Sequence, residues 1–139
     1  MSNRVQWIEH QGELIIFCDY TNIQEEEQFL QAIEEMEREV LKEEPGTFIR
    51  MLIDVTGSHV TAKVTGRARE VAAAAREKGI PSSPTAIVGV SGPAKQAIVL
   101  AMQFLRPDLR SVETIAEAKD WLVSRWRIRL SRWCLPAVA

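Results

Sequence analysis

The stretch Phe48-Ile-Arg-Met-Leu-Ile-Asp-Val-Thr-Gly57 decides the fold class of this chain. Its apolar side chains alternate, because successive side chains of an extended strand point to opposite faces. One face carries Ile49, Met51, Ile53 and Val55, and the other carries Phe48 and Leu52. A strand that is apolar on both faces is typical of a sheet with helices on both sides. We therefore predict a central strand in this stretch.

The polar turn after this strand, residues 54–59, is the first place to look for function. It contains Asp54, Thr56, Ser58 and His59. In open α/β sheets, ligands bind beyond the carboxyl ends of the parallel strands. We therefore expect this turn to belong to a recognition surface.

Length and composition bound the class of protein. The chain has 139 residues, of which 46% are hydrophobic and 26% charged, as expected of one globular domain. It contains no apolar run long enough to span a membrane. Residues 1–6 lack the apolar core of a signal peptide, which predicts a cytoplasmic protein. The net charge of −2 argues against a nucleic-acid partner, which would favour a basic domain.

Five strand-like runs and four helical runs follow one another along the chain. The strand-like runs are residues 5–9, 14–20, 48–57, 84–90 and 108–112. The helical runs lie at 22–44, 60–78 and 93–105, and from 114 onward. The first two strands are joined by a short Gly-containing turn, and helices separate the later strands. The order predicts a single-domain α/β fold over residues 1–124: a mixed sheet with an N-terminal antiparallel hairpin, then parallel strands, flanked by about four helices.

Several residues have the spacing of helix caps. Asn22 with Glu25, and Thr114 with Glu117, fit the capping-box pattern at helix starts. Ser91 and Gly92 precede a proline, which suits the first turn of the third helix. Gly79 before Ile80 fits a C-cap with a returning apolar contact.

The helix expected at 93–105 is apolar almost all round, so it must be covered on more than one face. We therefore expect it to be the surface of a homodimer. The turn before it, 89–92, contains two glycines and precedes Lys95. The phosphate-binding Walker pattern is absent, so this turn is interpreted first as structural and second as a weak anion site.

Cysteines and histidines give little sign of metal or redox chemistry. Cys18 and Cys134 lie in apolar contexts without a CxxC spacing, which favours reduced, buried thiols. His10 lies in a polar turn with no ligand at metal spacing, so we expect it to be solvent-exposed and expect no metal site. An enzyme with Asp54, His59 and either Cys18 or Ser58 as a nucleophile set is the less favoured alternative.

Residues 125–139 form a basic extension with four Arg and no acidic residue. The pattern favours a helix that carries Trp126, Arg129 and Trp133. Packing on the domain or on a second subunit is the favoured interpretation. Contact with an anionic membrane surface through these residues is the alternative, because Arg and Trp suit the interface.

Three segments resemble a known family. They are Leu52-Ile-Asp-Val-Thr-Gly57, Ala86-Ile-Val-Gly-Val-Ser-Gly92 and Glu113-Thr-Ile-Ala-Glu-Ala-Lys-Asp-Trp-Leu122. Together they resemble the SpoIIAA-like family of the STAS superfamily, which is related to bacterial anti-sigma factor antagonists. The resemblance covers residues 10–123. It implies a mixed sheet flanked by helices, no cofactor, and a role in regulation through a protein partner.

The resemblance also implies a phosphoacceptor. In phosphorylatable relatives an Asp-Ser-Ser-Gly segment opens the helix after the central strand, and its second serine accepts phosphate. The matching stretch here is Lys63-Val64-Thr65-Gly66, which makes Thr65 the candidate, although Lys63 and Val64 depart from the pattern. The candidate recognition surface comprises Asp54, Thr56, Ser58, His59, Lys63, Ser91 and Lys95. A small apolar or lipid ligand is the alternative, because relatives have been likened to lipid-binding CRAL-TRIO domains.

Overall fold

The computed structural model describes residues 4–81, 84–106 and 108–125. The strands are β1 (Val5–His10), β2 (Glu13–Asp19), β3 (Met51–Asp54), β4 (Thr85–Val88) and β5 (Leu109–Val112). The helices are α1 (Glu26–Leu41), α2 (Ala62–Lys78), α3 (Pro93–Leu105) and α4 (Ile115–Asp120). One turn of π-helix, Trp121–Arg125, continues α4. The element order is the one predicted from the sequence.

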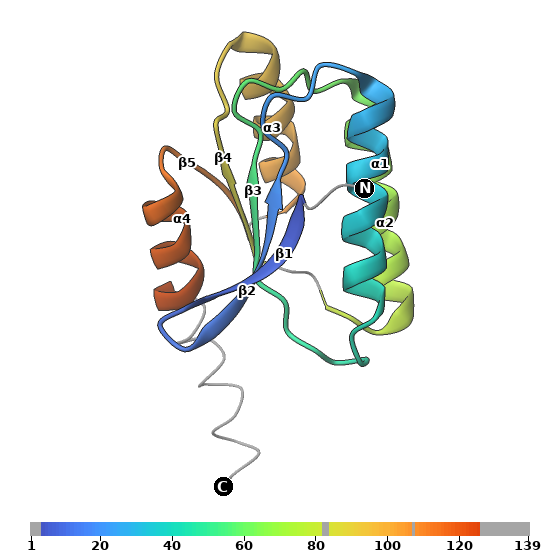
Figure 1. Ribbon diagram of the computed structural model, residues 1–139, viewed down its shortest axis with the longest axis vertical. Helices are drawn as coiled ribbons and strands as arrows, with labels where there is room; N and C mark the ends of the chain where they lie inside the picture. The colour runs from blue at the N-terminus through green and yellow to red at the C-terminus, as the bar shows by residue number, and fades with distance from the viewer. Residues whose placement is uncertain (1–3, 82–83, 107, 126–139) are drawn as a thin grey trace, which may run out of the picture.

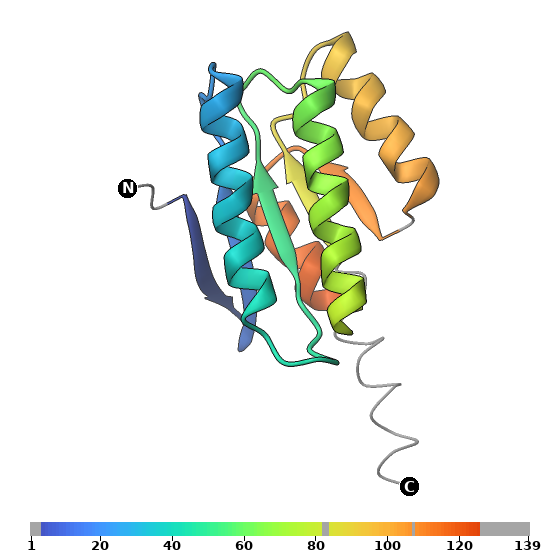
Figure 2. The same ribbon diagram turned by 90° about the vertical axis from the view of Figure 1, so that its right-hand side faces the viewer.

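The strands form one sheet in the order β1-β2-β3-β4-β5 (Figure 1). β1 and β2 are antiparallel, and every later neighbour is parallel. The three parallel connections all step in the same direction across the sheet. Because such crossovers share one hand, α1, α2 and α3 lie together on one face and α4 lies on the other (Figures 1 and 2). The predicted mixed sheet flanked by helices is confirmed.

The central strand separates two apolar cores, as its alternation predicts. Met51 and Ile53 pack into the larger core, which α1, α2 and α3 cover. Leu52 points the other way, into a smaller core beneath α4 that includes Leu122 and Val123 of the π-helical turn. Burial on both sides explains why this strand carries so little polar surface.

Two predicted helix caps, one N-cap and one C-cap, are confirmed, and one is wrong. The Thr114 hydroxyl accepts a hydrogen bond from the Glu117 backbone N–H at 3.1 Å, and Gly79 forms the C-cap of α2 with φ +96°. Asn22 does not cap α1, which begins four residues later with Glu25 as N-cap. Asn22 lies in a turn with φ +55°, where its own backbone N–H donates to the Thr56 carbonyl. At the start of α3, Gly92 and not Ser91 is the N-cap, and Pro93 lies in the first turn as predicted.

His10 is less exposed than predicted. It ends β1, is only partly exposed, and its Nε2 lies 2.9 Å from Oδ1 of Asp120 at the end of α4. The hairpin brings the first strand within reach of the last helix, a contact that local sequence cannot reveal. The histidine therefore joins the two ends of the described domain.

Cys18 is buried and reduced, as predicted. Burial raises the pKa of its thiol from 9.0 to about 12. Cys134 and the tail residues Trp126, Arg129 and Trp133 lie outside the described residues, so the predictions for the extension stay predictions. None of the helices in the described ranges is both long and apolar enough to cross a membrane.

Candidate ligand-binding site

The turn after β3 is built by Asp54. Its Oδ1 accepts hydrogen bonds from the Thr56 backbone N–H at 3.0 Å and from the Thr56 hydroxyl at 2.6 Å. Lys95 of α3 donates from Nζ to the Val55 carbonyl at 3.1 Å. Three of the predicted recognition residues thus meet at the carboxyl end of β3. Their hydrogen bonds shape the turn itself, and an Asp side chain commonly has this role in turns.

Ser58 belongs to the interior and not to a surface. It is 4% exposed, its hydroxyl donates to the Tyr20 carbonyl, and it accepts from the Ile23 backbone N–H at 2.9 Å. The serine therefore fixes the loop between β2 and α1 against the turn after β3. Burying these two backbone groups without Ser58 would leave them unpaired.

The predicted nucleophile set does not assemble. His59 is exposed, and the described side-chain hydrogen bonds include none between His59 and Ser58 or Asp54. Cys18 is fully buried with a raised pKa, which keeps it in the unreactive thiol form. Lys63 and Ser91 are exposed as predicted, but each lies apart from this turn's hydrogen bonds. The described residues also hold no group of three His, Cys, Asp or Glu that suits a metal.

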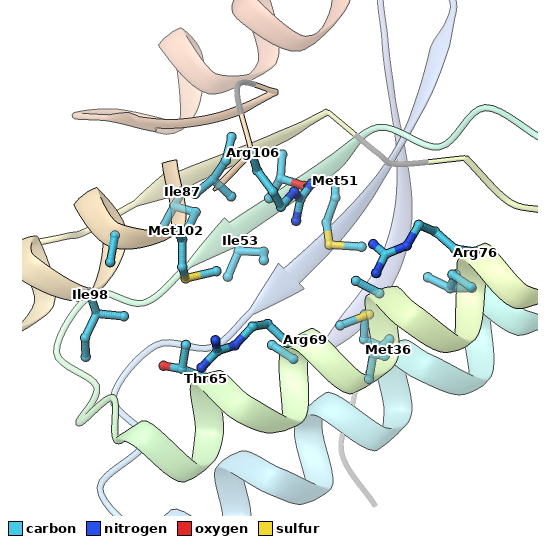
Figure 3. Close-up of a pocket in the computed structure, with 18 of the residues that line it drawn as sticks. Met36, Met51, Ile53, Thr65, Arg69, Arg76, Ile87, Ile98, Met102 and Arg106 are labelled. Carbon is cyan, nitrogen blue, oxygen red and sulfur yellow. The ribbon is translucent and has the colours of Figure 1, made fainter. Parts of the chain in front are cut away.

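Thr65 lies in the first turns of α2, where it is half-buried. Its hydroxyl donates to the Thr61 carbonyl at 3.1 Å, and Thr61 caps the helix by accepting from the Val64 backbone N–H at 3.2 Å. The Thr65 side chain also lines a pocket, and it is labelled in Figure 3. Thr65, the predicted phosphoacceptor, therefore borders the pocket of about 540 Å³ that is described below.

An open pocket of about 540 Å³ lies between α2 and α3, above β3 and β4 (Figure 3). Its floor includes Met51, Ile53 and Ile87 of the sheet. Met36 of α1 and Met102 of α3 also line it. The walls are mostly apolar, and thioether side chains can adapt to ligands of different shape.

Small side chains on α2 make room for this pocket. Ala62, Ala68, Ala72 and Ala75 all line it. α2 lies side by side with α1 (Figure 2), and Arg67 Nη2 of α2 is 2.6 Å from Glu37 Oε1 of α1. α3 diverges from this pair (Figure 2), and the pocket lies between α3 and α2. The sequence did not reveal these residues as the lining of a pocket.

A smaller cavity of about 90 Å³ extends the pocket toward the carboxyl ends of the strands. It shares Met36, Thr65 and Met102 with the larger pocket and reaches Lys95. Lys95 is thus the second predicted site residue that borders this space. The pocket and this cavity form one hollow along the sheet face. It ends near the polar turns that the sequence indicated as a recognition surface.

Three arginines stand among the lining residues, and no acidic side chain does. Arg69 and Arg76 come from α2, and Arg106 follows α3 (Figure 3). Arg106 Nε is 3.2 Å from Asp108 Oδ1, and its Nη2 donates to the Thr85 hydroxyl at 3.2 Å. The pocket therefore combines apolar walls with a basic rim.

The sheet order, with three helices on one face and one on the other, defines a SpoIIAA-like α/β fold with a pocket in the three-helix layer. Among solved structures, the chain is similar to an uncharacterized protein of the DUF3478 family from Shewanella loihica PV-4, which is described as having a SpoIIAA-like fold. The two share 17% identity over 85% of this chain and 91% of that chain, with a TM-score of 0.60. No protein-family model and no curated protein matches the chain. The resemblance seen in the sequence is confirmed at the level of the fold.

Proposed function

We propose that this chain is a non-enzymatic binding domain that takes up a small apolar ligand in the pocket between α2 and α3. The observation that carries this proposal is the pocket itself. Its volume of about 540 Å³ lies in the range typical of small-molecule sites, and its apolar lining with a few polar groups is the usual composition of such sites.

The expected affinity follows from the burial of the ligand. Each methylene removed from water contributes about 0.8 kcal/mol, so eight buried methylenes contribute about 6 kcal/mol. Association costs several kcal/mol in lost translational and rotational freedom. We therefore expect probes that bury more apolar surface to bind more tightly than smaller ones.

The test uses the fluorescence of N-phenyl-1-naphthylamine, a neutral probe that brightens in apolar sites. Ala72→Phe fills the pocket, because Ala72 lines it, whereas Ala73→Phe places the same ring on the exposed side of α2. We expect saturable binding to the wild type and to Ala73→Phe, and about a tenfold loss in Ala72→Phe. Equal binding by both variants would place the probe elsewhere and would overturn the proposal.

A protein contact through α3 is a second candidate function, and it is favoured by one observation. Leu100 and Phe104 are 68% and 90% exposed, and they lie one turn apart on the same face of the helix. Such an exposed apolar pair suits a partner surface, and a second copy of this chain is the partner expected from the sequence. Sedimentation velocity of the wild type and of Leu100→Ser/Phe104→Ser tests it. A wild type that stays monomeric at high concentration would contradict the homodimer.

A further inference from the structure

The pocket is long as well as apolar. Ala62 and Arg76 both line it, and they lie fourteen residues apart on α2. At 1.5 Å per residue, this separation corresponds to about 21 Å along the helix. An extended, single-chain ligand fits such a hollow better than a compact ring system does.

The arginines of α2 fall into two groups. Arg67 faces α1, where it pairs with Glu37 at 2.6 Å and with Glu70 at 3.5 Å. Arg69 and Arg76 line the pocket instead, and no carboxylate of the described residues lies within 4.0 Å of either guanidinium. The basic rim on this wall is therefore not neutralised by the protein.

Arg69 and Arg76 place two positive charges along one rim of the pocket. They are seven residues apart, which puts them two turns, about 10 Å, apart on one side of α2. In Figure 3 the Arg69 guanidinium lies beside Thr65, and the Arg76 guanidinium points toward Met51, as does that of Arg106 from the opposite wall. Both α2 arginines are exposed, so an anion at the rim would keep part of its hydration. This lowers the cost of moving a charge out of water.

Charge also argues against the chain's own C-terminal extension as the occupant of the pocket. The chain's own extension, residues 125–139, carries Trp and Leu side chains of suitable size. It also carries four arginines and no acidic residue, so it would meet the basic rim with like charge. A ligand with a negative group is the complementary partner.

Resting on the proposed function, we infer that the natural ligand is a single-chain amphiphile with an anionic head group, such as a fatty acid. Its chain lies along β3 and β4. The positive rim formed by Arg69 and Arg76 attracts its head group, and one of the two guanidiniums binds it by charge-assisted hydrogen bonds.

The experiment measures how decanoate and decanol displace N-phenyl-1-naphthylamine from the full chain at neutral pH. The two competitors share the same chain length and differ in the charge of the head. The test variant is Arg69→Gln/Arg76→Gln. The control is Arg38→Gln/Arg110→Gln, which removes two exposed positive charges outside the pocket.

We expect the test variant to bind decanoate about fivefold more weakly, because one partly exposed ion pair contributes up to about fivefold and the second positive charge attracts the head group only at longer range. Decanol should displace the probe equally from all three proteins. Added salt should weaken decanoate binding to the wild type and to the control variant, and much less to the test variant, since it screens Arg69 and Arg76. For the wild type, that measurement does not depend on any variant folding.

Two other outcomes are distinguishable. If decanol and decanoate bind the wild type and the test variant alike, without salt dependence, the head-group inference is wrong while the apolar pocket stands. If neither the probe nor decanol binds, the proposed function fails and the inference fails with it.

Discussion

Substitution of Gly89 by alanine tests how the turns after β3 and β4 pack together. Gly89 and Gly92 both have φ of +86°, a conformation that L side chains rarely adopt. Their surroundings differ. A Cβ at Gly89 would lie 2.5 Å from the Thr56 backbone N and 2.7 Å from its Cα, and closer still to its hydroxyl. A Cβ at Gly92 would meet nothing within 4 Å.

The two substitutions therefore separate backbone strain from overlap. Gly92→Ala costs only the strained backbone, about 1–3 kcal/mol of unfolding free energy. Gly89→Ala costs a similar strain, and it also forces two backbone segments apart, which adds about 1–3 kcal/mol. We expect Gly89→Ala to be the more destabilising by about 2 kcal/mol. Thr56→Gly should not rescue it, because the backbone N and Cα of residue 56 remain in place.

Urea unfolding followed by far-UV circular dichroism gives the free energy of unfolding for the wild type and for each variant. If Gly89→Ala and Gly92→Ala lower the unfolding free energy equally, overlap with the turn after β3 does not explain the need for glycine at position 89. Full rescue of Gly89→Ala by Thr56→Gly would show that only a side chain is in the way. Either result would refute the packing described for these turns.

Three further predictions use the same unfolding and binding assays. Ser58→Ala should lower the unfolding free energy by about 1–3 kcal/mol, because it leaves two buried backbone groups unpaired, whereas exposed Ser91→Ala should change it little. The pKa of Cys18 is about 12 in the folded chain and near 9.0 when exposed, so the unfolded state loses the thiol proton first as the pH rises. Stability should therefore fall above about pH 9, by up to about 1.4 kcal/mol per pH unit, and Cys18→Ala should show a shallower slope. Thr65→Glu should weaken decanoate binding, because a carboxylate one turn from Arg69 competes for its guanidinium, and Thr65→Ser should bind like the wild type. Unchanged decanoate affinity in Thr65→Glu would place Thr65 outside the binding region.

Local patterns predicted most of the fold. The alternation around Leu52 predicted a strand buried on both faces, and the sheet shows both cores. The Thr114 cap and the Gly79 C-cap were predicted correctly, because each depends on hydrogen bonds within a few residues. Asn22 was predicted wrongly, because its conformation depends on Thr56, which is distant in sequence.

The candidate site was predicted only in part. Thr65 was singled out by the family resemblance and Lys95 by its place after the turn at 89–92, and both border the pocket or its smaller extension. Ser58 was predicted to be at the surface because it is polar, yet it is buried against a loop that the sequence does not place beside it. Arg69 and Arg76 were not singled out, since helical periodicity does not say what lies opposite a given face.

By itself, the sequence determined the element order, the two-faced central strand and the absence of a recognisable catalytic motif. These depend on periodicity and short-range capping, which are written into neighbouring residues. Only the tertiary structure decided that α3 diverges from α2, that the alanines of α2 border a hollow, and that two of its arginines face that hollow while a third pairs with α1. A pocket is a space between elements that are far apart in the chain. Its existence depends on helix angles and side-chain volumes summed across the whole layer, which no single stretch of sequence specifies.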